Sequence, residues 1–182
     1  MRSTSFLSVA TFLALGMGGL HAQAVHSDSS EDQRWSLHLG SGYHQKRIGI
    51  NLESAPLWTS SFMGKAIELS SEVGIAHWTY HGPRVENQTR ALVQLSAIPV
   101  FRWWVGKDLF LEGGIGATLV SKNELGPRQL STSFQFGDHI GFGYRLNPNN
   151  WLGLRYSHYS NASIKKPNNG LDTLQMTWRT AY

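Results

Sequence analysis

Apolar side chains alternate with polar or small ones at every second position through most of the chain after residue 33. In residues 131–146, Phe134, Phe136 and Ile140 share one parity, Asp138 is its polar exception, and the other parity holds glycine and polar residues. Successive side chains of a strand point to opposite faces, so this period predicts strands with one apolar face. Turn signals rich in Gly, Pro and Asn separate these runs, and the sequence therefore predicts an all-β fold. The eight predicted strands are residues 34–43, 46–54, 65–80, 89–104, 108–121, 131–146, 150–160 and 172–182.

The residue types of the two parities indicate which face points inward. The polar parity consists mainly of Gly, Ser and Thr with scattered Arg and Glu and very few Lys, whereas a water-exposed face is usually rich in Lys. Small residues and Arg–Glu pairs suit a narrow barrel interior, and bulky aliphatic and aromatic residues suit lipid. Interior ion pairs are therefore expected among Glu68, Glu72, Glu112, Arg102, Arg145, Arg155 and Arg179.

These features predict an eight-stranded antiparallel transmembrane β-barrel of the bacterial outer membrane. Several runs have the length of a tilted membrane-spanning strand, about 9–11 residues. Trp103, Trp151, Trp178 and Tyr182 lie near strand ends, where aromatic girdles occur. Short turns alternate with longer loops, and the interior of such a barrel is just wide enough for side chains. A soluble ligand-binding barrel is the alternative, and it would place the apolar parity inside.

The first 24 residues have the pattern of a secretory signal peptide. Arg2 precedes an apolar stretch, which ends in Ala22 and Ala24 at the spacing that signal peptidase requires. Residues 25–182 are then expected to form the barrel as a single domain.

No later segment has a run of about 18 apolar residues, the length that a membrane-spanning helix requires. The chain has no cysteine, which excludes a disulfide scaffold. In an exported protein the net charge of +4 suits anionic lipid head groups, and no nucleic-acid partner is expected.

Chemically reactive side chains gather in the stretch RYSHYSNASIKKPNNGLD, residues 155–172. Strand parity directs His158 and Ser160 of one run and Asp172 of the next run toward lipid, beside one hairpin. Polar groups on a lipid-facing surface are costly, which indicates that these three serve a function.

The three side chains are of the types found in a serine hydrolase triad. His158 and Ser160 are about 6.5–7 Å apart along one strand face, so the imidazole can act as the base for the hydroxyl. A carboxylate at Asp172 can hold the imidazole tautomer, and the amide of Asn161 can donate to a developing oxyanion. A metal site is disfavoured because the cluster has one histidine, and the chain has no cofactor motif.

The stretch HYSNASIKKPNNGLD resembles the C-terminal signature of the PagL family of outer-membrane lipid A 3-O-deacylases, and FLEGGIGATLVS and FQFGDHIGFGYRL extend the similarity. The resemblance implies that His158 and Ser160 are catalytic. It implies that Asp172 is the acidic third member, where well-known members carry Glu, and that Asn161 helps to form the oxyanion hole. It also implies the reaction, which is hydrolysis of the ester that holds the primary 3-hydroxyacyl chain at position 3 of lipid A in lipopolysaccharide.

The expected location is the outer membrane, with the site facing the outer leaflet. If both termini lie in the periplasm, the hairpin after Ser160 lies at the outer surface, where a serine esterase can reach an acyl ester without extracting the lipid. Lys165 and Lys166 of that hairpin can pair with lipid A phosphates. A homodimer through the apolar outer surface is compatible with the sequence. The apolar residues beside the site, which can hold acyl chains, are Leu152, Leu154, Leu174 and Met176.

Two other functions remain open from the sequence. A non-enzymatic small barrel with a structural or adhesive role would give no purpose to the outward His158, Ser160 and Asp172. An acyltransferase that modifies lipid A would use a pocket reached from the lumen, and inward parity at the site would favour it.

Overall fold

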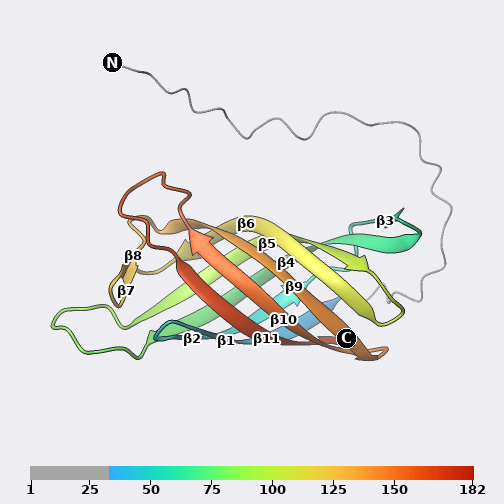
Figure 1. Cartoon of the computed structure of the whole chain (residues 1–182), viewed down its shortest axis with the longest axis horizontal. Helices are drawn as coiled ribbons and strands as arrows, with labels where there is room; N and C mark the ends of the chain where they lie inside the picture. Colours follow the sequence, from blue (N-terminus) through green and yellow to red (C-terminus); the bar gives the residue numbers. More distant parts are fainter. Residues whose placement is uncertain (1–32) are drawn as a thin grey trace, which may run out of the picture.

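The computed structural model describes residues 33–182, so the predicted signal peptide at residues 1–24 lies outside the described residues. Within the described range every regular element is a β-strand (Figure 1). The strands are β1 (Arg34–Gly42), β2 (Gln45–Glu53), β3 (Trp58–Phe62), β4 (Lys65–Tyr80), β5 (Ala91–Trp104), β6 (Leu109–Val120), β7 (Glu124–Leu125), β8 (Arg128–Gln129), β9 (Phe134–Asn147), β10 (Asn150–Ser160) and β11 (Leu171–Ala181).

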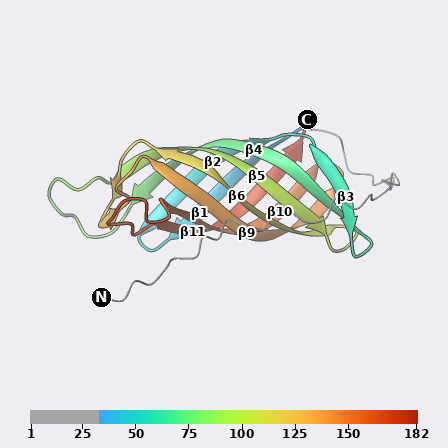
Figure 2. The same cartoon turned by 90° about the horizontal axis from the view of Figure 1, so that it is seen from above.

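One antiparallel sheet closes on itself as a barrel of tilted strands (Figures 1 and 2). The order is β2-β1-β11-β10-β9-β6-β5-β4-β3, and an additional pairing of β2 with β4 closes the sheet. β2 and β3 follow one another along the same edge of β4, so the nine strands fill eight positions around the barrel. The predicted eight-stranded antiparallel barrel is confirmed.

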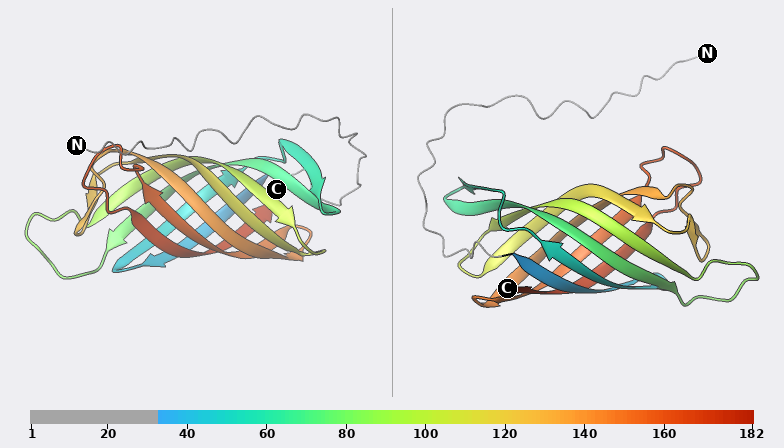
Figure 3. Two further views of the ribbon diagram at one scale, coloured as in Figure 1. Left: turned by 45° about the horizontal axis from the view of Figure 1, so that its top comes forward. Right: turned by 180° about the vertical axis from the view of Figure 1, so that it is seen from behind.

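Three short strands were not predicted. β3 pairs with the first residues of β4 through a tight turn at Met63 and Gly64, both with positive φ (52° and 70°). This hairpin lies at the barrel end that carries the C-terminus (Figure 3). β7 and β8 are two residues each and pair within the loop between β6 and β9. Strands this short do not display a period of two, which explains why the pattern missed them.

The polar parity faces the interior and the apolar parity faces outward. In β2, Arg47 and Asn51 are buried at 4% and 2% exposure, whereas their neighbours Ile48 and Ile50 are 51% and 54% exposed. A soluble barrel would show the reverse. Because each strand contributes bulky apolar side chains to the outside, the outer surface is suited to hydrocarbon, as in an outer-membrane barrel.

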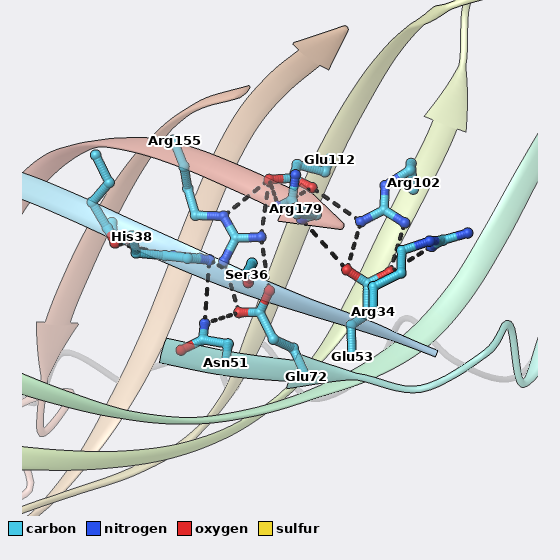
Figure 4. Close-up of polar contacts among 12 residues, drawn as sticks. Arg34, Ser36, His38, Asn51, Glu53, Glu72, Arg102, Glu112, Arg155 and Arg179 are labelled. Carbon is cyan, nitrogen blue, oxygen red and sulfur yellow. Dashed lines mark hydrogen bonds and ion pairs between the residues drawn. The ribbon is translucent and has the colours of Figure 1, made fainter. Parts of the chain in front are cut away.

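Ion pairs fill the middle of the lumen (Figure 4). Glu112 contacts Arg155 at 2.9 Å, Arg179 at 2.8 Å and Arg102 at 3.4 Å, and all four side chains are 3% exposed or less. Interior ion pairs form among the predicted residues except Arg145, and the network also includes Arg34 and Glu53. Its other contacts are Arg34–Glu53 at 2.8 Å, Arg102–Glu53 at 2.7 Å, Arg155–Glu72 at 2.7 Å, Arg179–Glu53 at 3.5 Å and Arg102–Glu68 at 4.0 Å.

Arg145 does not belong to this central network, contrary to expectation. Its guanidinium pairs with Asp108 at 3.2 Å, and the two side chains are 20% and 31% exposed. Arg145 lies two residues from the end of β9, and Asp108 lies in the turn before β6, so the pair is near one end of the barrel.

Aromatic residues close this same end of the interior, and one predicted girdle residue is among them. Trp151 is 4% exposed and packs with Trp104 and Phe110, and the guanidinium of Arg34 lies 4.9 Å from its ring centre. Its placement in the lipid-facing girdle was therefore wrong, because Trp151 has the inward parity of β10. Trp178 does face outward at 39% exposure.

The first residue of β1 pairs with the last residue of β11, so the described chain starts and ends at one end of the barrel. We call this the terminal end and the opposite one the loop end (Figure 3). The loop end carries the connections at residues 43–44, 81–90, 121–133 and 161–170. Beneath them a second apolar cluster fills the lumen, made of Trp78, Tyr80, Leu92, Val120, Leu125, Leu130, Tyr159 and Leu171. Within residues 33–182, no helix is long and apolar enough to cross a membrane.

Candidate active site

His158 and Asp172 are direct cross-strand partners on β10 and β11. Nδ1 of His158 lies 2.8 Å from Oδ1 of Asp172, and the two side chains are 35% and 39% exposed. Both belong to the outward parity, as predicted from the alternation. The contact leaves Nε2 of the imidazole as the nitrogen that can exchange a proton with another group.

Tyr156 contributes a second hydrogen bond to the same carboxylate. Its hydroxyl donates to Oδ1 of Asp172 at 2.6 Å. Two groups therefore converge on one carboxylate oxygen from β10, where residues two apart share a face. The sequence placed Tyr156 among the lipid-facing residues and gave no sign of this contact, because the partner lies across a hairpin.

Ser160 is the last residue of β10, two positions beyond His158 and on the same face. Its side chain is half-buried, and within the described part of the chain no hydrogen bond joins its hydroxyl to His158. Catalytic hydrogen bonds are often long without substrate and tighten in the complex. The structure thus brings His158 and Asp172 into contact and leaves Ser160 adjacent to them.

Gly170 packs against the imidazole at the other end of the hairpin. A Cβ built on it would lie 2.7 Å from Cε1 of His158 and 3.1 Å from the carbonyl oxygen of Tyr159, and its φ is +63°. Both the space and the backbone conformation therefore require glycine here. The sequence signal was the turn-forming NNG before Asp172, but nothing in it pointed to the histidine.

Asn161 lies differently from what was expected. It is 1% exposed, and its Nδ2 donates to the carbonyl oxygens of Leu130 at 2.8 Å and Lys165 at 2.9 Å. Both amide protons are thus engaged within the protein, so the side chain holds the loop and does not point to the outer face. Asn161 has the inward parity, which is why its amide turns away from Ser160.

The loop at residues 161–170 is braced by the loop at residues 121–133. Arg128 donates to the carbonyl oxygen of Asn169 at 3.1 Å, and the backbone N–H of Gln129 donates to Oδ1 of Asn169 at 3.0 Å. The backbone N–H of Asn169 in turn donates to the carbonyl oxygen of Gln129 at 3.0 Å. These contacts fix the hairpin that carries Ser160 and Asp172 on its two ends.

Three further features lie around this cluster. Lys165 and Lys166 are exposed in the loop, and within residues 33–182 neither has a carboxylate at ion-pair distance. Tyr159 is 4% exposed and packs edge-to-face on Trp78, so its ring fills the lumen beneath the site. Asp138, the polar exception of its run, is the register partner of His158 on β9, so carboxylates flank the histidine on both neighbouring strands.

Comparison with known proteins gives one family. The family model described as "Lipid A 3-O-deacylase (PagL)" matches residues 44–181. The chain belongs to the PagL family. It is 46% identical over 145 residues to the lipid A deacylase PagL of Bordetella bronchiseptica, which is 79% of this chain and 80% of that protein. It is 35% identical to the lipid A deacylase PagL of Pseudomonas aeruginosa over 88 residues, 47% of this chain and 51% of that protein.

Solved structures agree with this membership. The crystal structure of the outer membrane enzyme PagL superposes with a TM-score of 0.68 at 25% identity, covering 82% of this chain and 99% of that one. The Yersinia pestis outer membrane protein Ail matches with a TM-score of 0.52 at 10% identity, covering 83% of this chain and 99% of Ail, which is a likeness of fold alone. The PagL-like chain is therefore an outer-membrane β-barrel with a polar cluster on its outer face at the loop end.

Proposed function

We propose that this PagL family member removes the primary 3-hydroxyacyl chain at position 3 of lipid A, with Ser160, His158 and Asp172 as its catalytic triad. The observation that carries the proposal is the 2.8 Å contact between His158 and Asp172 on the outer face of the barrel, one step from Ser160. Family membership supplies the substrate and the bond. The cluster supplies the residue types that ester hydrolysis needs.

The reaction proceeds in two steps. Nε2 of His158 takes the proton of the Ser160 hydroxyl as Oγ attacks the ester carbonyl carbon. The tetrahedral intermediate collapses, and the bond between the acyl carbon and the 3-oxygen of the sugar breaks. The imidazolium then gives its proton to the departing 3-oxygen. Water, deprotonated by the same imidazole, then hydrolyses the acyl-serine and releases a 3-hydroxy fatty acid. Asp172 holds Nδ1–H throughout and stabilises the imidazolium.

Backbone N–H groups of the turn after Ser160 stabilise the oxyanion in this proposal. Ala162 and Ser163 have positive φ values of 51° and 63°, and their N–H groups donate no hydrogen bond within residues 33–182. Unengaged donors beside the nucleophile are what an oxyanion hole requires. Asn161 contributes through its buried amide, which holds this turn in place, and not as a direct donor.

The site faces the outer leaflet of the outer membrane. Three of the four connections at the loop end, residues 81–90, 121–133 and 161–170, are long, and long connections of such barrels are extracellular. At the terminal end, residues 105–108 and 148–149 form short turns. The triad then lies where the acyl esters of lipopolysaccharide meet the aqueous surface. An outward site also argues against an acyltransferase with a lumen pocket, because apolar side chains and ion pairs fill the lumen. Lys165 and Lys166 are proposed to attract lipid A phosphates from the adjacent loop.

The test is mass spectrometry of lipid A after treatment of lipopolysaccharide with the detergent-solubilised protein. The wild type should release one 3-hydroxy fatty acid per lipid A. Ser160→Ala should lower the rate by more than about a thousandfold, and Asp172→Asn by about 10²–10⁴-fold, because the amide cannot hold the correct tautomer. Unchanged lipid A with a folded wild type would refute the proposed activity. Full activity of folded Ser160→Ala would refute the proposed nucleophile.

A further inference from the structure

Two basic side chains lie on the outward face away from the triad. Lys46 of β2 and His77 of β4 both have the lipid-facing parity and are exposed. The register pairs Lys46 with Thr79 and Ile48 with His77, so the two basic residues are close diagonal neighbours on adjacent strands. Within residues 33–182 neither has a carboxylate at ion-pair distance. Lys46 is the second residue of β2, directly after the turn at residues 43–44, so its ammonium lies at the loop end of the barrel, where the head groups of the lipids meet water. An anionic group of a lipid can therefore act as its partner.

An apolar groove runs from these two residues toward the triad. Its volume is about 580 Å³, within the range of about 300–1,000 Å³ that small-molecule sites occupy. Its apolar walls come from four strands. The polar side chains that line it are Ser41, Lys46, Arg47, His77 and Thr79. The apolar residues that line it are Leu39, Ile48, Leu154, Leu174 and Met176.

The groove ends at Leu174, next to the proposed triad. Leu174 follows Asp172 on the same face of β11, and its cross-strand partner is Tyr156, whose hydroxyl binds Asp172. The same row continues through Ser41 on β1 to Lys46 on β2. Lys46 is therefore two strand spacings from β11, about 10 Å. A single lipid with several acyl chains on one phosphorylated head group can span that distance.

We propose that this groove holds a second acyl chain of the lipid A molecule whose ester Ser160 attacks, and that Lys46, with His77 beside it, binds a phosphate of the same molecule. The inference rests on the proposed function and adds a subsite to it. Adjacency to the proposed triad favours this occupant over a phospholipid, whose position would need no relation to the reacting ester. In this arrangement the groove orients the head group relative to Ser160. It therefore contributes to the turnover of lipid A and not to the hydrolysis of a small ester by the triad.

The test compares two substrates for each variant in detergent. One is bisphosphorylated lipid A, and the other is a short-chain p-nitrophenyl ester that needs only the triad. Lys46→Gln should lower kcat/KM for lipid A about fivefold, because a basic residue near an anionic head group contributes about 1 kcal/mol, and should leave ester hydrolysis unchanged. Lys65→Gln is the control, since it removes the same charge at the terminal end. With monophosphorylated lipid A as a third substrate, the effect of Lys46→Gln should shrink.

A second pair of variants tests the acyl part of the groove. Leu39→Trp should fill it and lower kcat/KM for lipid A at least as much, again without an effect on the short ester, because Leu39 lines the groove from β1 and is 48% exposed. Leu95→Trp is the control, because Leu95 is 51% exposed on β5, across the barrel from β11. Unchanged lipid A turnover in Lys46→Gln and Leu39→Trp would overturn the proposal. Equal losses on both substrates, or a change of oligomeric state in Leu39→Trp, would also overturn it. Activity that survives Ser160→Ala would instead contradict the proposed function.

Discussion

The hydroxyl of Tyr156 donates a hydrogen bond to Oδ1 of Asp172 at 2.6 Å, from the strand that also carries the histidine. The side chain of Asp172 is shorter than that of a glutamate by one methylene group. The Tyr156 hydroxyl holds in place the carboxylate oxygen that also contacts His158. Tyr156→Phe should lower kcat about fivefold, since one hydrogen bond to a charged group is worth about 1–2 kcal/mol when partly exposed. KM should change little.

A pH–rate profile separates this positioning role from a loss of packing. Removal of the donor destabilises the Asp172 carboxylate, so the acid limb of kcat should move to higher pH in Tyr156→Phe. An unchanged profile with an unchanged kcat would show that the hydroxyl does not position Asp172.

Gly170→Ala should displace the imidazole of His158. The new Cβ would meet Cε1 of the ring at 2.7 Å and would sit at a positive φ, which adds strain of about 1–2 kcal/mol. Deacylation should fall at least tenfold while the barrel stays folded. Gly64→Ala is the matched control, because Gly64 has φ +70° and no atom lies within 4 Å of the position that its new methyl group would take. If both variants lose activity equally, the contact with His158 is not the cause.

Asn161→Asp tests the loop-holding role of the buried amide. The substitution replaces a donor to the carbonyl oxygens of Leu130 and Lys165 with a second acceptor, so the turn after Ser160 should loosen. Loss of a buried hydrogen bond costs about 1–3 kcal/mol. Hydrogen exchange should increase in both residues 161–170 and residues 121–133, with reduced deacylation. Reduced deacylation with unchanged exchange in both loops would favour a direct role for the side chain at the oxyanion.

Glu112→Gln should destabilise the barrel. Three arginines converge on this buried carboxylate, and its neutralisation leaves their charges incompletely paired in the lumen. Breaking a buried ion pair costs about 3–5 kcal/mol, which thermal unfolding in detergent would detect as a lower midpoint. Asp108→Asn removes the half-exposed partner of Arg145 and should cost no more than about 1 kcal/mol. Equal midpoints for the two variants would contradict the central role of Glu112.

Acidification should weaken the hydrogen bonds through which Glu124 links the loops at residues 81–90 and 121–133. Hydrogen bonds from the Thr89 hydroxyl and from Gln129 hold the pKa of the Glu124 carboxyl below its ordinary value. A lowered pKa in the folded state means that the link stabilises the loops above the ordinary pKa, about 4.3, and is lost as the pH falls through the lowered value. Hydrogen exchange in residues 81–90 should therefore rise on acidification in the wild type. After correction for the pH dependence of the intrinsic exchange rates, Glu124→Gln should show the same exchange in residues 81–90 at neutral and acid pH.

The alternation of side chains was sufficient to predict the barrel, because a strand fixes which neighbours share a face. It located eight strands, put polar residues inside, and directed His158, Ser160 and Asp172 outward beside one hairpin. It failed for Trp151, whose place near a strand end suggested the girdle although its parity is inward. It also missed β3, β7 and β8, which are too short or too irregular to show a period.

The tertiary structure decided which side chains contact one another across neighbouring strands. Sequence spacing cannot show that Tyr156 reaches Asp172, that Gly170 abuts the imidazole, or that Asp138 is the register partner of His158. Each of these contacts depends on the register between strands, which the apolar pattern and the geometry and length of the turns set together. The amide of Asn161 is the clearest case. Its residue type suggested an oxyanion donor, but the loop from residues 121–133 supplies the carbonyl oxygen that binds one of its protons. The sequence determined the faces of the strands, and closure of the sheet determined which side chains meet on them.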